Sequence, residues 1–349
     1  MSKEFNIENL VRENVKSLKP YSSARDEYDS SGAGMVFMDA NENPFDNGVN
    51  RYPDPHQLTL KVALAEHKKI DPKNILLGNG SDEVLDLLFR AFCEPKTDNV
   101  ITLPPTYGMY DVLAKINNVE VREVPLTAQF QPNLEAILDS IDSRSKLLFI
   151  CSPNNPTGNS FDQDNIKKLL VAFKGLVVID EAYIDFSIND SWTTELHQYP
   201  NLVVVQTLSK AYGLAGIRLG MAMASEQIIA ILKKIKPPYN VNQLTQARAL
   251  QRVLNKERVT MEVSEILEQK TLLQQILPKI GFVKHVYPSD ANFILVKVDD
   301  ANKRYAQLLG LGVVVRNRSS QPLCENTLRF TIGTNEENIK LITALKGLN

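Results

Sequence analysis

The stretch Leu176-Val177-Val178-Ile179-Asp180-Glu181-Ala182-Tyr183 decides the fold, because an apolar run ends there abruptly in two carboxylates. A short aliphatic run bounded by polar residues is typical of a strand that is buried on both faces of a sheet. Such a strand would carry Asp180 to its carboxyl end, which is where open α/β sheets bind ligands. Burial penalises an isolated charge, so we expect Asp180 either to have a cationic partner or to lie in an exposed turn.

The chain on both sides of this stretch alternates apolar runs with helical periodicity, from about residue 54 to residue 235. This alternation predicts an α/β fold with a mostly parallel sheet flanked by helices. Further strands are expected at residues 75–77, 100–103, 146–151 and 202–206. The pair Asp54-Pro55 predicts a helix that is capped by the aspartate and has the proline at its first position.

The sequence changes in character after Lys236-Pro237-Pro238, which we interpret as a joint between domains. Residues 242–279 have no strand signal and predict one or two long helices. Short strands are expected at 282–287, 293–298, 313–316 and 328–332, with helices near 301–310 and 336–347. We therefore expect a large domain over residues 31–245, a smaller α/β domain over 246–349, and an N-terminal arm over 1–30 that joins the small domain.

The composition of the chain excludes several classes of protein. Hydrophobic residues make up 43% of the 349 residues and charged residues 23%, which argues against a disordered or collagen-like chain. Lys and Arg number 39 against 41 for Asp and Glu, so no excess of positive charge favours nucleic acid or an anionic membrane. The sequence has no apolar leader and no apolar run of membrane-spanning length, and we expect a cytoplasmic protein.

The cysteines and histidines give no sign of a metal site. Cys93, Cys151 and Cys324 lack short metal-ligand spacings, and their odd number fits a reducing compartment better than a disulfide framework. We interpret them as buried structural residues. The four histidines are scattered along the chain, so no metal is predicted.

Three more polar clusters follow expected strands and would meet Asp180 at the same edge of the sheet. In the first, residues 78–83, glycines and the free amides at the start of a helix favour a phosphate. An ordinary turn capped by Ser81 accounts for the same residues. The second by itself is typical of a turn. In the third, Lys210 lies among small and apolar residues, where desolvation would lower its pKa and make its amine nucleophilic. The clusters are Gly78-Asn79-Gly80-Ser81-Asp82-Glu83, Ser152-Pro153-Asn154-Asn155-Pro156-Thr157-Gly158 and Thr207-Leu208-Ser209-Lys210-Ala211-Tyr212-Gly213-Leu214-Ala215-Gly216-Ile217-Arg218.

Taken together, Asn155-Pro156-Thr157-Gly158, Asp180-x-x-Tyr183 and Ser209-Lys210 with Arg218 downstream resemble the fold-type-I, pyridoxal-phosphate-dependent aminotransferases. The resemblance is closest to the histidinol-phosphate aminotransferase family and extends from residue 20 to residue 334. It implies a large domain with a mostly parallel central sheet, a smaller α/β C-terminal domain, and pyridoxal 5′-phosphate as the cofactor. It also implies a homodimer, with L-histidinol phosphate and glutamate or 2-oxoglutarate as substrates.

The resemblance assigns most of the clustered residues to the cofactor. Asp180 would face the protonated pyridine nitrogen, and Asn155 and Tyr183 would bind the 3′-oxygen of the ring. Lys210 would hold the cofactor as a Schiff base and move the proton of the substrate's α-carbon. The phosphate would contact the backbone of Gly80, Ser81 and Asp82 and the side chains of Ser209 and Arg218.

Two further expectations concern the walls of this site. Tyr107 is similar in position to the family's aromatic residue that stacks on the cofactor ring, and the alternative is an ordinary core aromatic. Asp82 and Glu83 suit a helix N-terminus on their own account. We therefore expect their carboxylates to point away from the phosphate while their amides face it.

Residues outside these clusters are candidates for contacts with the substrate and with a second subunit. Tyr21, within residues 19–25, and Asn41, within a strand and turn expected at 38–44, resemble substrate-binding positions of the family. Tyr52 resembles the tyrosine that crosses to the cofactor phosphate of the partner subunit. If this likeness holds, each active site needs a homodimer.

Arginines near the C-terminus are candidates for anion binding, because a guanidinium offers two parallel donors to a carboxylate or a phosphate. The resemblance implies that Arg329 takes the α-carboxylate of the amino acid and that Arg316 shares in binding both anions. Asn155 is expected to contact the substrate as well as the cofactor. Arg318 is interpreted as a solvated residue.

The scaffold supports other reactions, and the sequence leaves two of them open: those of an aromatic amino-acid aminotransferase and of a threonine-phosphate decarboxylase. The reaction type depends on which substrate bond stands perpendicular to the cofactor ring, which the sequence does not reveal. A regulator that keeps an aminotransferase-like domain as a sensor is disfavoured, because the sequence has no basic recognition helix.

Overall fold

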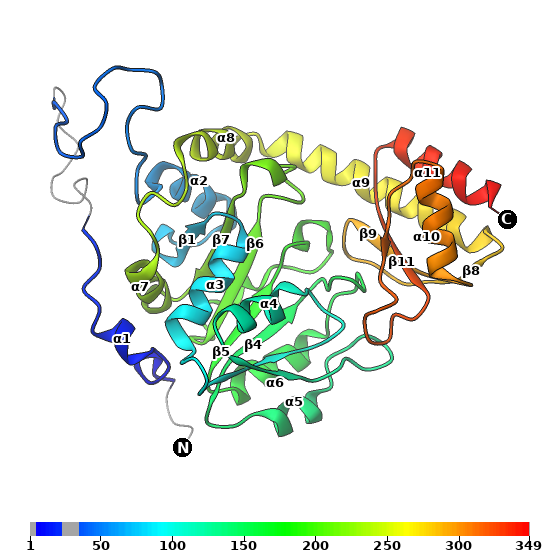
Figure 1. Ribbon diagram of the computed structural model, residues 1–349, viewed down its shortest axis with the longest axis horizontal. Helices are drawn as coiled ribbons and strands as arrows, with labels where there is room; N and C mark the ends of the chain where they lie inside the picture. Colours follow the sequence, from blue (N-terminus) through cyan, green and yellow to red (C-terminus); the bar gives the residue numbers. More distant parts are fainter. Residues whose placement is uncertain (1–4, 23–34, 349) are drawn as a thin grey trace.

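The computed structural model describes residues 5–22 and 35–348, which form two sheets with helices packed against them (Figure 1). The larger sheet has seven strands in the order β1-β7-β6-β5-β4-β2-β3. Neighbouring strands are parallel, except that β7 runs antiparallel to both β1 and β6. The strands are Ile75–Gly78 (β1), Asn99–Thr102 (β2), Glu120–Glu123 (β3), Ser145–Cys151 (β4), Leu176–Asp180 (β5), Leu202–Thr207 (β6) and Gly220–Ala224 (β7).

Five of these strands coincide with the expected ones, and β3 and β7 are additional. β3 is a polar edge strand, Glu-Val-Arg-Glu, and lacks the apolar run by which the other strands were recognised. β7 consists of glycine, alanine and methionine and is fully buried between β1 and β6. Its strand conformation depends on those two neighbours, because small residues have little intrinsic preference for a strand. The mostly parallel sheet is confirmed.

Helices cover both faces of this sheet and make a three-layered structure. Alternate residues of β5 divide between two apolar cores, with Val177 and Ile179 on one side and Leu176 and Val178 on the other. The first core takes in α2 (Leu58–Lys68), α5 (Leu134–Ser140) and α6 (Gln163–Ala172). The second takes in α3 (Ser81–Phe92), α4 (Met109–Ile116), α7 (Glu226–Ile235) and the short α1 (Glu13–Lys16).

Helix α2 begins later than the pair Asp54-Pro55 predicts. Gln57 has a left-handed backbone conformation with φ 51°, so the regular helix starts only at Leu58. Asp54 still caps this end, because its carboxylate accepts hydrogen bonds from the N–H of His56 at 2.7 Å and of Leu58 at 2.6 Å. Pro55 therefore lies in the turn before the helix and not at its first position.

The smaller sheet has the order β10-β11-β9-β8 and is antiparallel throughout. The strand expected at 313–316 is shorter and lies later, because pairing with β11 begins only at Arg316. The apolar core of this part takes in residues of α9 (Lys256–Ile276), α10 (Ala301–Gly310) and α11 (Asn335–Gly347). The strands are Val283–Val286 (β8), Phe293–Val298 (β9), Arg316–Asn317 (β10) and Thr327–Thr331 (β11).

The stretch 242–279 forms two consecutive helices, α8 (Gln243–Leu254) and α9, as one of the sequence alternatives predicts. They are separated at Asn255, whose side chain accepts a hydrogen bond from the N–H of Arg258 and so caps α9. Figure 1 shows α9 extending from beside α8 to the smaller sheet. Within residues 5–22 and 35–348, no helix has the length and apolar character that a membrane span requires.

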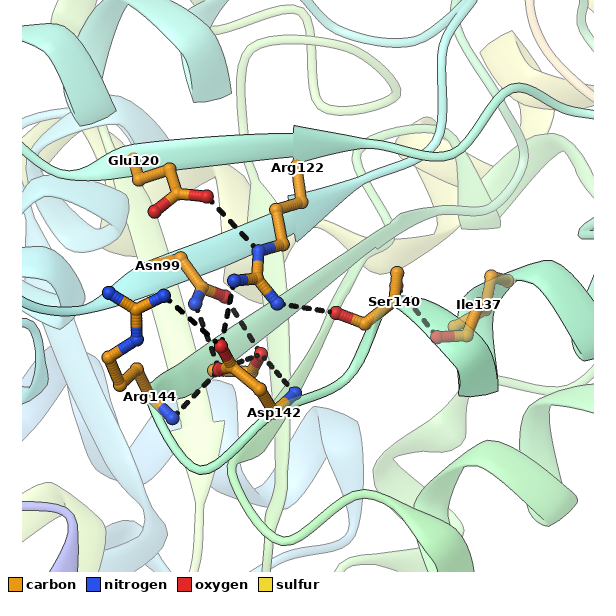
Figure 2. Close-up of polar contacts among 8 residues, drawn as sticks. Asn99, Glu120, Arg122, Ile137, Ser140, Asp142 and Arg144 are labelled. Atoms are coloured by element: carbon orange, nitrogen blue, oxygen red, sulfur yellow. Dashed lines mark hydrogen bonds and ion pairs between the residues drawn. The ribbon is translucent and has the colours of Figure 1, made fainter.

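A polar network fixes the amino-terminal side of β2, β3 and β4, around Asp142 (Figure 2). The carboxylate of Asp142 accepts hydrogen bonds from Nδ2 of Asn99 at 3.0 Å and from Nη2 of Arg122 at 2.7 Å. Nη1 of Arg122 also donates to the carbonyl of Ser140 at 2.8 Å. The hydrogen bond from Asn99, with those from Arg144 and Arg122, holds the pKa of Asp142 well below its usual range. This structural network leaves the carboxyl ends of the same strands free for a site.

Candidate functional site

A cleft of about 540 Å³ opens beside the carboxyl ends of β4, β5 and β6, and residues of the smaller sheet line its other side. It brings together residues that lie far apart in the sequence, as a parallel topology predicts. Gly80, also expected at the site, does not itself line the cleft but directly precedes Ser81, which does. Eleven residues expected from the sequence line the cleft: Ser81, Asp82, Tyr107, Asn155, Asp180, Tyr183, Ser209, Lys210, Arg218, Arg316 and Arg329.

Asp180, at the end of β5, is only 3% exposed. The O–H of Tyr110 donates to its Oδ2 at 2.8 Å and the N–H of Ala182 donates to its Oδ1 at 3.1 Å. Burial raises its pKa to about 6, although these hydrogen bonds and the nearby charge of Lys210 act in the opposite direction. The exposed turn considered for Asp180 is therefore wrong. No described side chain forms an ion pair with it, so a cationic group of a ligand would compensate this buried acid.

Tyr110 is a candidate positioning residue that sequence reasoning missed. Its side chain is fully buried in α4, where its ring stacks on Phe149 with the centroids 4.8 Å apart. This packing fixes the hydroxyl that holds Asp180. The available signal was its spacing from Tyr107, three residues earlier, because the two rings meet edge-on at 5.6 Å.

Lys210 lies in the loop after β6 and lines the cleft while remaining accessible to solvent. Its Nζ is 5.6 Å from the centroid of the Tyr183 ring. Partial burial of the ammonium lowers its pKa, and the positive charge of Arg329 lowers it further. An accessible lysine with a lowered pKa has the properties that an amine nucleophile or base requires.

Asn155 and Tyr183 form one polar wall of the cleft. Nδ2 of Asn155 donates to the hydroxyl of Tyr183 at 3.4 Å, and the guanidinium of Arg329 donates to Oδ1 of Asn155. The loop is fixed by buried Asn154, whose Nδ2 donates to the carbonyl of Pro105 at 2.9 Å. Asn155 and Tyr183 are therefore close enough to bind one ligand oxygen together, and Asn155 connects this wall to the arginines.

The start of α3 offers a concave backbone surface that side chains would fill. Gly80 has φ +87°, and a Cβ there would lie 2.8 Å from Nη2 of Arg218. A Cβ on Gly220 of β7 would lie 2.2 Å from the backbone nitrogen of Ser81, so this glycine allows the strand to approach the helix end. The free N–H groups of the first helical turn and the Arg218 guanidinium consequently face the same space, which fits a phosphate.

The carboxylates of Asp82 and Glu83 differ in direction. Asp82 lies 3.8 Å from Nη2 of Arg218 and accepts a hydrogen bond from the hydroxyl of Tyr107 at 3.1 Å, so the expectation that it points away is wrong. The positive charge and the hydroxyl attract it into the cleft. Glu83 points away as expected, because its carboxylate accepts hydrogen bonds from the N–H of Asn79 and from Nδ2 of Asn240. Tyr107 itself is half-buried and lines the cleft.

The arginines of the smaller sheet lie on the opposite side of the cleft. Arg316 and Arg329 are directly paired residues of β10 and β11. The Arg329 guanidinium lies over the ring of Phe293 at 5.0 Å, and burial lowers its pKa. Arg318, expected to be solvated, is instead half-buried and lines the cleft. Its position two residues after Arg316 brings it to the same face of the sheet, a consequence of β pairing that the sequence reading did not use.

Three candidate residues lie outside this cleft in the single chain. Tyr21 is 72% exposed, and Asn41 and Tyr52 line a separate pocket of about 420 Å³ with residues 242–244. The ring of Tyr52 stacks on Tyr239 at 4.6 Å. Residues 38–44 contain no strand, and Asn41 has φ 55°. A single chain therefore does not bring Tyr21 and Asn41 to the cleft. Tyr52 is expected to contact the partner subunit, and its position outside the cleft agrees with that expectation.

The cysteines and the possible metal ligands of residues 5–22 and 35–348 form no second centre. Cys93, Cys151 and Cys324 are free and buried, as expected for structural residues. In the described part of the chain, no three histidine, cysteine or acidic side chains are grouped so that they could hold a metal ion. Residues 23–25 of the candidate substrate segment, with residues 1–4 and 23–30 of the expected N-terminal arm, lie outside the described residues.

The chain is similar to known proteins over almost its whole length. The family described as "Aminotransferase class I and II" matches residues 37–345. A protein of Flavobacterium johnsoniae named histidinol-phosphate aminotransferase is 64% identical over 346 residues, 99% of each chain. The crystal structure of the histidinol-phosphate aminotransferase from Clostridium acetobutylicum has a TM-score of 0.80 and 26% identity, covering 86% of this chain and 91% of that one. A histidinol-phosphate aminotransferase from Sinorhizobium meliloti, in complex with pyridoxal-5′-phosphate, has the same fold with a TM-score of 0.78 and 24% identity, covering 85% and 82%. The chain thus belongs to the class I and II aminotransferase family.

Proposed function

We propose that this protein is a pyridoxal-phosphate-dependent aminotransferase that exchanges the amino group between L-histidinol phosphate and 2-oxoglutarate in L-histidine biosynthesis. The single observation that carries the proposal is the cleft, which joins an accessible lysine and a buried, unpaired aspartate to a set of arginines. The first two groups suit the cofactor, and the arginines suit a phosphate and a carboxylate. The names of close relatives support the same substrate.

The residues around the cleft fit pyridoxal phosphate by their chemistry. When bound, this cofactor supplies an electron sink for the breaking of a bond at the substrate's α-carbon. Asp180 would keep a proton on the ring nitrogen, and Tyr107 would lie against the ring. Asn155 and Tyr183 would hold the ring oxygen, with their side chains 3.4 Å apart. The backbone at Gly80, Ser81 and Asp82, with the side chains of Ser209 and Arg218, would hold the phosphate; the N–H of Gly80 itself donates to the carbonyl of Gly78 at 2.8 Å, so the free amides are those of the residues after it.

Lys210 would have two successive roles. It would first anchor the cofactor covalently through its amine, for which the lowered pKa is an advantage because the neutral amine is the nucleophile. Once the substrate's amine has replaced it, the released Lys210 would take the proton from the substrate's α-carbon and deliver it to the reacting carbon of the cofactor. Tyr183, whose ring lies 5.6 Å from Nζ, would help to position the lysine.

The anion site would serve two substrates in turn. Arg329 would bind the α-carboxylate of glutamate, and Arg316 and Arg329 would together bind the phosphate of L-histidinol phosphate. Asn155 accepts a hydrogen bond from Arg329, which links recognition of the anion to the wall that holds the cofactor. Because one site serves both halves of the reaction, the kinetics would be of the ping-pong type.

A homodimer completes the proposal. Apolar side chains are exposed over residues 18–22 and 35–62, and their exposure favours burial against a second copy. They include Leu18, Met35, Val36, Met38, Phe45, Val49 and Tyr52. Tyr52 would then reach the partner's cofactor phosphate, and Tyr21 and Asn41 would contact substrate through the assembled dimer. We also propose a large domain over 31–245, a small domain over 246–349, and a cytoplasmic location. Residues 5–22 of the arm expected over 1–30 contribute Ile7, Val11 and Val15 to the second core of the larger sheet, so the arm is not proposed to join the small domain.

The test is a spectral titration of each half-reaction. The cofactor-loaded protein should convert its cofactor to the aminated form with L-histidinol phosphate and with L-glutamate, and glutamate should accumulate from L-histidinol phosphate and 2-oxoglutarate. Phenylalanine and tyrosine in parallel titrations measure the breadth of the reaction, and release of carbon dioxide from threonine phosphate detects a decarboxylase. Failure to convert L-histidinol phosphate contradicts the proposal.

A further inference from the structure

Three arginines project from one face of the smaller sheet. Arg316 pairs with Arg329 across β10 and β11, and the N–H of Arg318 continues the ladder by donating to the carbonyl of Thr327 at 2.9 Å. Paired residues of neighbouring strands share a face, as do alternate residues of one strand. Arg316, Arg318 and Arg329 therefore project together, and all three line the cleft.

The described residues give these arginines no carboxylate partner. The two acids that line the cleft already have other partners. Asp82 contacts Arg218 and Tyr107. Asp180 accepts hydrogen bonds from Tyr110 and from the N–H of Ala182. The Nε atoms of Arg318 and Arg329 are buried without a hydrogen-bond partner. Burial and the charge of Arg316 lower the pKa of Arg318. Buried cationic donors of this kind are unfavourable unless an anion enters the space beside them.

The two substrates of the proposed function present their anions at different distances from the amine. In glutamate the α-carboxylate is bonded directly to the carbon that carries the amine, and the second carboxylate lies on the branch that carries the imidazole in histidinol phosphate. In histidinol phosphate a methylene carbon and an ester oxygen separate that carbon from phosphorus, and the phosphate monoester carries close to two negative charges near neutral pH. Arg329 contacts Asn155, and its charge acts on Lys210, so it is the arginine at the reacting end. A phosphate must extend beyond it.

We propose, on the basis of the proposed function, that Arg318 is the residue that makes the cleft selective for the phosphate ester. It contacts the phosphate together with Arg316 and Arg329, on the side away from Lys210, whereas the α-carboxylate of glutamate reaches only Arg329. Arg318 consequently distinguishes the two halves of the reaction. Its loss weakens recognition of L-histidinol phosphate and leaves recognition of glutamate nearly unchanged.

The experiment compares Arg318→Gln and Arg318→Lys with wild type by calorimetric titration of the enzyme whose cofactor is already aminated. In that form an amine substrate binds without amino transfer, so the dissociation constant is measured apart from activity. The ligands are L-histidinol phosphate, L-histidinol without the phosphate, and L-glutamate. Arg258→Gln is the matched control, because Arg258 is an exposed arginine of α9 paired with Glu262 outside the cleft.

Arg318→Gln should raise the dissociation constant of L-histidinol phosphate about ten- to a hundredfold, the size expected for a lost charged hydrogen bond. The dissociation constants of L-histidinol and L-glutamate should change by no more than about twofold. For L-histidinol phosphate, Arg318→Lys should give a dissociation constant between those of wild type and Arg318→Gln, because lysine keeps the charge but lacks the two parallel donors of a guanidinium. Equal losses for L-histidinol phosphate and L-glutamate, or no loss for either, overturn the inference. A wild type that does not aminate 2-oxoglutarate from L-histidinol phosphate contradicts the proposed function itself, so the two failures are distinguishable.

Discussion

Replacement of Asp180 by asparagine should change the stability of the cofactor-free protein in a pH-dependent manner. Burial raises the pKa of this carboxyl from 3.8 to about 6, so its ionisation opposes folding as the pH rises through this range. A difference of this size corresponds to a penalty of about 3 kcal/mol once the pH is well above 6. Asparagine removes the charge and keeps the shape of the side chain.

Asparagine also loses part of the hydrogen bonding, which sets the net magnitude. The carboxylate accepts from both Tyr110 and the N–H of Ala182, and the amide has only one acceptor atom for these two donors. Loss of one hydrogen bond costs about 1 kcal/mol. We therefore expect Asp180→Asn to be about 2 kcal/mol more stable than wild type at about pH 8, and no more stable near pH 4, where the folded aspartic acid is protonated.

Urea unfolding of the cofactor-free, full-length protein at both pH values measures this difference. Glu181→Gln is the matched control, because Glu181 is also buried with its pKa raised to about 6, but it binds Ser191, the N–H of Trp192 and Gln206 and does not line the cleft. Removal of the charge in Glu181→Gln should raise the free energy of unfolding at high pH by about 2 kcal/mol, a smaller gain than for Asp180→Asn. The hydrogen bond that glutamine loses reduces this gain. The variant should still carry out both half-reactions. Asp180→Asn should lower turnover about a hundredfold or more.

One result would refute this reasoning. If Asp180→Asn is destabilised equally at both pH values, the charge of Asp180 is compensated by a cation of the chain itself. The buried acid would then need nothing from a ligand, and its assignment to the cofactor ring would lose its physical basis.

Four further predictions follow from the same geometry. Lys210→Ala should still bind pyridoxal phosphate but should catalyse no transfer, and borohydride should fix the cofactor to the wild type and not to this variant, as mass spectrometry would detect. Gly80→Ala should weaken cofactor binding about tenfold in an absorbance titration, because the new Cβ meets Arg218 at 2.8 Å and φ +87° is strained for alanine. Asp142→Asn should be less stable than wild type at neutral pH, because the hydrogen bonds from Asn99, Arg144 and Arg122 lower the pKa of the native carboxyl. The difference in stability should shrink as the pH falls below 3.8, the ordinary pKa of an aspartate. Urea unfolding across that pH range measures it. A mixture of Lys210→Ala and Tyr52→Phe subunits should regain activity that neither pure variant has, and a mixture that stays inactive contradicts the role of Tyr52 across a dimer.

Sequence reasoning located the elements of the larger sheet where burial on both faces leaves a clear apolar run. β4, β5 and β6 meet this condition, and their expected and observed limits differ by no more than a residue at either end. It missed β7, Gly-Met-Ala-Met-Ala, which contains no β-branched or aromatic residue. Gly220 is required there because a Cβ would collide with the start of α3, and this packing leaves no signal of a strand in the sequence.

The cofactor side of the candidate site was predictable because its residues follow strands that end at one edge of the sheet. Lys210, Asp180, Asn155 and Tyr183 lie in the cleft for this reason. Those roles stay proposals, whereas the aminotransferase family and fold are confirmed. Tyr110 and Arg318 could not be found in this way. Their roles depend on side-chain packing and on the register of β10 with β11, which the spacing of Tyr110 from Tyr107 and of Arg318 from Arg316 does not fix by itself.

The cleft keeps the charge of Asp180 apart from the arginines of the smaller sheet, and this separation bears on the proposed chemistry. Asp180 is fixed at the end of β5 by Tyr110, and the arginines are fixed to β10 and β11 of the other sheet, so the rigid elements prevent an ion pair that would otherwise form readily. A ligand recovers the lost electrostatic energy only if a cationic group meets Asp180 while an anion meets the arginines. A protonated pyridine ring joined to an anionic substrate satisfies both requirements at once, whereas either part alone satisfies one. With the proposed roles of these residues, the cleft would favour cofactor and substrate bound together over either one alone.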